Sequence, residues 1–82
     1  SQFMIERARQ FYNRLASDSE DPQTRIERGY ALLYNRVPTE EELKIGLTFV
    51  SSVQTQGPAD KIDKWVQYCQ VLLSSNELMF IR

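Results

Sequence analysis

The chain has 82 residues, of which 41% are hydrophobic and 26% charged, and its ten basic and eleven acidic residues give a formal net charge of −1. This length suits one small domain, and no apolar run is long enough to span a bilayer. The balanced charge gives no general attraction to nucleic acid or to an anionic membrane. Because histidine is absent and Cys69 is the single cysteine, an internal disulfide and an ordinary structural zinc site are excluded.

The first predicted helix spans about residues 3–16. Its main apolar residues recur at intervals of four, three and four, which places them on one helical face. They are Met4, Ala8, Phe11 and Leu15. The polar stretch 17–20 is expected to end this helix.

The second predicted helix begins with Asp21 as N-cap and Pro22 at the first helical position, where its missing amide costs nothing. Its inner face is expected to hold Ile26, Tyr30 and Leu33. Gly29 lies beside that face and suggests the close approach of a neighbouring helix. Asn35 can adopt the left-handed conformation that closes a helix, and Pro38 prevents a simple continuation.

The third predicted helix begins with a capping box, in which the Thr39 hydroxyl bonds the amide of Glu42 and the Glu42 carboxylate returns to Thr39. Apolar residues continue at helical spacing: Leu43, Leu47 and Val50, widened by Ile45, Phe49 and Val53. The wide stripe predicts burial on two sides. Gly57 and Pro58 are expected to stop the helix.

The fourth predicted helix spans about residues 60–74, where apolar residues again recur at three and four: Ile62, Trp65, Val66, Cys69, Leu72 and Leu73. Residues 75–82 are read as a short helical turn capped by Ser75, with an extended tail as the alternative. The sequence thus predicts an all-α, four-helix bundle-like single domain over residues 1–82, with a short C-terminal turn or tail.

Two stretches of the sequence resemble a known family. Residues 25–43 are similar to the family segment R-x-x-R-x-Y … G-R-x-P-T-x-x-E-L, and residues 65–80 to its ending W-x-x-x-C-x-x-L-L-x-S-N-E-F-x-Y. The start, from Phe3 to Leu15, also fits. Asn35 stands where the family has glycine, and Leu78 where it has an aromatic residue.

The family comprises large planctomycete proteins that combine a cytochrome-c-like module with domains of unknown function. The chain resembles the C-terminal end of the last such domain, so the resemblance implies a fragment of a longer protein that is exported, periplasmic or surface-associated. It implies no established activity. The haem-binding Cys-x-x-Cys-His motif of such proteins is not present in these 82 residues.

Candidate contact residues lie near the turns. Arg36 is a possible anion or partner contact, and its structural interpretation is a pair with Glu40–Glu42 or with helix-end carbonyls. Asn76 and Glu77 are a possible polar pair for a partner domain, and their structural interpretation is a helix cap. Leu78 and Phe80 complete the candidate partner contacts.

Other candidate sites have simpler structural explanations. Trp65 is expected to pack in the core, with ligand stacking as the alternative, and Cys69 is expected to be a small buried apolar residue, since no histidine is present to activate it. The acidic run 40–42 caps a helix rather than forming a catalytic pair. Residues 22–56 have a helix-turn-helix pattern, but the acidic start of the second helix would repel DNA phosphates.

The leading functional hypothesis is a non-catalytic helical module, without cofactor or metal, that docks onto other domains of its parent protein. It predicts an exposed apolar patch near Leu78, Met79, Phe80 and Ile81. One alternative is an accessory domain that completes an enzyme's active site with Arg36, Tyr34 or Glu77. Another is a small-ligand module, for example for carbohydrate, that uses Trp65 or the tyrosines.

Overall fold

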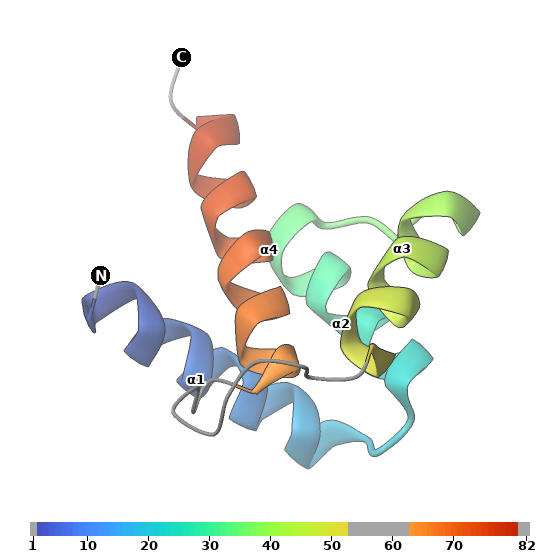
Figure 1. The fold of residues 1–82 in the computed structure, drawn as a ribbon. Helices are drawn as coiled ribbons and strands as arrows, with labels where there is room; N and C mark the ends of the chain where they lie inside the picture. The colour runs from blue at the N-terminus through green and yellow to red at the C-terminus, as the bar shows by residue number, and fades with distance from the viewer. Residues whose placement is uncertain (1, 53–62, 81–82) are drawn as a thin grey trace.

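A computed structural model describes residues 2–52 and 63–80, with the side chains of residues 2 and 77–80 left out. It contains α1 (Gln2–Asp18), α2 (Pro22–Tyr34), α3 (Glu40–Ser51) and α4 (Lys64–Phe80), and the described residues hold no strand (Figure 1). The prediction of a compact all-α domain built from four packed helices is confirmed.

Helix α4 is the element around which the others are arranged. It contacts α1, α2 and α3, and its most extensive packing is against α1. Helices α2 and α3 pack against one another on one side of α4, whereas α1 crosses near the beginning of α4 and makes no packing contact with α3 among the described residues (Figure 1). The end of α4 extends past the other helices in this view.

The predicted signals at both ends of α2 are confirmed. The Asp21 carboxylate accepts a hydrogen bond from the Thr24 amide at 3.0 Å, and Pro22 is the first helical residue. Asn35 has φ 60° and ψ 36°, and its amide donates to the carbonyl of Ala31. The left-handed residue therefore turns the chain out of α2 toward α3.

The predicted capping box of α3 is also confirmed. The amide of Glu42 donates to the Thr39 hydroxyl at 3.1 Å, and the Thr39 amide donates to the Glu42 carboxylate at 2.9 Å. Helix α3 ends at Ser51. Gly57 and Pro58, which were expected to stop it, lie outside the described residues.

The C-terminal prediction needs a correction. Residues 75–80 are neither a separate turn capped by Ser75 nor an extended tail, because they continue α4 without a break. The segment contains no glycine or proline, and serine and asparagine only mildly disfavour a helix that is already formed. At its other end α4 begins at Lys64, and residues 60–62 lie outside the described part.

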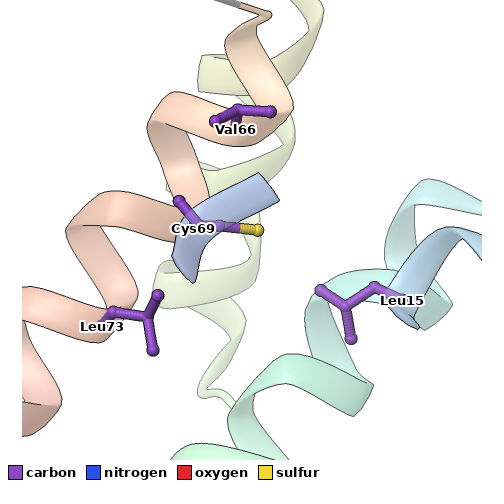
Figure 2. Packing of buried hydrophobic residues seen from close by; sticks show 5 residues of the cluster. Leu15, Val66, Cys69 and Leu73 are labelled. Carbon is purple, nitrogen blue, oxygen red and sulfur yellow. The ribbon is translucent and has the colours of Figure 1, made fainter. Parts of the chain in front are cut away.

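The buried residues form two clusters on different faces of α4. The first, here named the sealed cluster, consists of Ala8, Leu15, Val66, Cys69 and Leu73. Figure 2 shows its three α4 residues along one face of that helix, with the Cys69 sulfur directed toward the side on which Leu15 lies. The second, here named the tyrosine cluster, consists of Ile26, Tyr30, Tyr68 and Leu72.

The two helical glycines of the described residues have different roles. A Cβ at Gly29 would lie 3.5 Å from the nearest atoms of Leu15 and Leu72, which is an ordinary contact, so the suggestion that Gly29 permits a close approach is wrong. A Cβ at Gly46 would lie 2.5 Å from the hydroxyl oxygen and 2.9 Å from the Cζ of Tyr68. The close approach therefore occurs between α3 and α4, at Gly46.

Candidate functional site

A cleft of about 300 Å³ lies between α2, α3 and α4, over the tyrosine cluster. Three tyrosines, an arginine–glutamate pair and several aliphatic side chains line it. We name it the tyrosine cleft, and its lining residues are Tyr30, Tyr34, Arg36, Glu42, Ile45, Tyr68, Val71, Leu72 and Ser75.

Tyr68 is the most deeply buried of the polar residues that line the tyrosine cleft. Its side chain comes from α4, is 6% exposed, and places its hydroxyl against the backbone of Gly46 in α3. That hydroxyl is buried without a hydrogen-bond partner among the residues described. Burial, followed by the neighbouring hydroxyl of Tyr30, raises the pKa of Tyr68 well above its ordinary value of 10.0. Tyr68 therefore stays neutral and keeps its proton as a potential donor.

Tyr34 is held in place by a hydrogen bond to α4. Its hydroxyl donates to the backbone carbonyl of Leu72 at 2.7 Å. Its ring meets the ring of Tyr30 edge to face, with 5.0 Å between the centroids and an interplanar angle of 72°, which is a favourable arrangement for two aromatic rings. These contacts fix one wall of the cleft.

An ion pair closes one end of the cleft. The two terminal nitrogens of Arg36 donate to the two carboxylate oxygens of Glu42 at 2.9 and 3.0 Å, and one of them also donates to the carbonyl of Val37. The guanidinium lies 5.3 Å from the ring centroid of Tyr30. Hydrogen bonds from Arg36 and from the Thr39 amide lower the pKa of Glu42 from 4.5 to about 2. The two charges therefore neutralise one another at the cleft.

Two aliphatic residues that line the cleft are largely open to solvent. Ile45 of α3 is 60% exposed and Val71 of α4 is 53% exposed. The wide apolar stripe of α3 had predicted burial on two sides, and for Ile45 that prediction is wrong. Since a helical period shows which residues share a face but not what covers it, this exposure had no signal in the sequence.

The structure brings only part of the predicted site together. Arg36 lies in the cleft with Tyr34, bound to Glu42 as its structural interpretation expected. Asn76 is half-buried in the middle of the last turns of α4. The expectation that it caps a new helical turn is therefore wrong. The side chains of Glu77, Leu78 and Phe80, and the predicted apolar patch that ends at Ile81, lie outside the described residues.

Trp65 packs among two aromatic rings and the guanidinium of Arg25. Its ring lies 5.9 Å from that of Tyr12 and 6.1 Å from that of Tyr68, and the Arg25 guanidinium lies 5.2 Å from the Trp65 ring centroid. Arg25 also donates to the carbonyl of Ser19 at 2.7 Å. These contacts connect the start of α4 to α1 and α2, and Trp65 does not line the tyrosine cleft.

The Cys69 thiol is enclosed in the core. Cys69 is fully buried, and burial raises the pKa of its thiol from 9.0 to about 12. The described parts of the four helices and their turns contain no group of acidic or cysteine side chains that could hold a metal ion. Nor is any helix within those parts long and apolar enough to cross a membrane.

No family model, curated protein or solved structure matches this chain. The resemblance to the planctomycete family therefore stays a prediction.

Proposed function

We propose that the chain is a non-catalytic helical module that docks onto another domain of a larger polypeptide, and that the tyrosine cleft receives a segment of that domain. The observation that carries this proposal is the exposure of Ile45 and Val71 beside a preformed cleft. Covering the exposed part of each side chain would contribute on the order of 1 kcal/mol to binding. Because both side chains line the same cleft and are not scattered singly over the surface, they support an interaction surface at this place.

The chemistry of the cleft favours an uncharged protein segment as its occupant. Arg36 and Glu42 neutralise each other, so the cleft offers no unpaired charge to attract an ionic substrate. The tyrosines have pKa values raised by burial, and the sequence contains no histidine. These features support a binding role, because a general base that works near pH 7 is not among the cleft side chains.

One observation favours a second candidate, a small-ligand module. Aromatic walls with a few converging polar groups are typical of ligand pockets, and about 300 Å³ is at the small end of their range. Trp65, one of the residues first considered for this role, lies outside the cleft, but Tyr30 and Tyr34 line it. A free ligand would fill the cleft without covering a continuous protein surface around it.

Site-directed photo-crosslinking separates the two candidates. A photo-crosslinking amino acid is placed at Ile45, at Val71 or, as the control, at Leu32, which is 40% exposed on α2 and does not line the cleft. The host is the longest natural polypeptide that contains this chain. We expect crosslinks from positions 45 and 71 to one defined segment of another domain, and their loss in a Val71→Glu variant that carries the crosslinker at Ile45.

Two results would overturn the docking proposal. The first is a crosslink yield at positions 45 and 71 that is no higher than at position 32. The second is crosslinking only between copies of the chain, together with a concentration-dependent dimer in sedimentation that Val71→Glu abolishes, since the occupant would then be a second copy.

A further inference from the structure

We draw no further inference here: the strongest candidate, the apolar surface patch of α3 and α4 where Phe49 lies beyond the tyrosine cleft with Ile45 and Val71, carries none, because nothing in the structure shows what covers it.

Discussion

The two faces of α4 differ in how completely they are covered. Toward α1, the sealed cluster packs Val66, Cys69 and Leu73 against apolar and aromatic neighbours, and Cys69 has no exposed surface. Toward α2 and α3, the same helix presents Tyr68 and Leu72 under a cleft, with Val71 beside them and 53% exposed. One face of α4 is therefore fully covered by other helices, whereas its other face borders an open and partly polar cleft.

This contrast supports the proposal that stability and docking depend on different faces of a very small domain. The sealed cluster contains no hydrogen-bonding side chain apart from a thiol, so it stabilises the fold by apolar burial alone. The tyrosine cluster buries the two hydroxyl-bearing residues Tyr30 and Tyr68, and the cleft above it leaves apolar surface of Ile45 and Val71 in water. Departures from ideal packing of this kind are expected at functional surfaces.

The largest effect is expected in the sealed cluster, from Leu15→Ala. Leu15 is fully buried, and removal of such a side chain leaves a cavity that costs about 3 kcal/mol in the free energy of unfolding. Urea denaturation followed by circular dichroism measures the loss. Leu32→Ala, at a position that is 40% exposed, is the control and should cost less than about 1 kcal/mol. Equal losses for the two variants would show that the sealed cluster is not the main core.

The second largest effect is the difference in stability between alanine variants of the two glycines. Gly46→Ala is expected to destabilise the domain by about 2 kcal/mol, because the new Cβ meets the Tyr68 ring and hydroxyl. Gly29→Ala should be neutral or stabilise by up to about 1 kcal/mol, since its Cβ has room and alanine favours a helix. Thermal unfolding of both variants measures the difference. Equal stabilities would contradict the close α3–α4 contact.

The smallest effect concerns pH and the ion pair at the cleft. The folded-state pKa of Glu42 is about 2, below the ordinary 4.5, so its carboxylate stabilises the fold above about pH 4.5 and this contribution is lost as the pH falls toward 2. The carboxylate is 33% exposed, and solvent screening limits the effect to at most about 1 kcal/mol.

The variant Glu42→Gln tests this pH dependence. It should be less stable than the parent chain at pH 6, and the difference should shrink as the pH falls toward 2, where the Glu42 carboxyl of the folded chain is about half protonated. Denaturation curves at several pH values measure it, with Glu41→Gln as a neighbouring exposed control. A stability difference that persists unchanged at pH 2 would contradict the assignment.

The sequence predicted features that depend on neighbouring residues and missed those that depend on packing. The cap at Asp21, the left-handed Asn35 and the Thr39–Glu42 box join residues three or four positions apart, or concern one backbone conformation, so their residue types were sufficient. The Gly46–Tyr68 contact joins different helices, and only their packing reveals it.

The sequence predicted the turn residue of the candidate site but not the residues that helix packing brings to the cleft. Arg36 was identified because it lies in a turn, and its pairing with the acidic start of α3 was one of the two interpretations. The roles of Tyr68, Ile45 and Val71 depend on which helix covers which face, which periodicity does not specify. The continuation of α4 beyond Ser75 was missed because serine and asparagine are typical of helix caps but do not require one.

The most direct test of the contrast between the two faces of α4 is the labelling rate of two thiols on that helix under native conditions. Cys69 in the parent chain is compared with the thiol introduced by Val71→Cys in a Cys69→Ala background. Because Cys69 is fully buried and burial raises its pKa to about 12, it should react at least about 10³-fold more slowly than the new thiol, through unfolding alone. Labelling rates within tenfold of each other would contradict a helix with one sealed face and one open face.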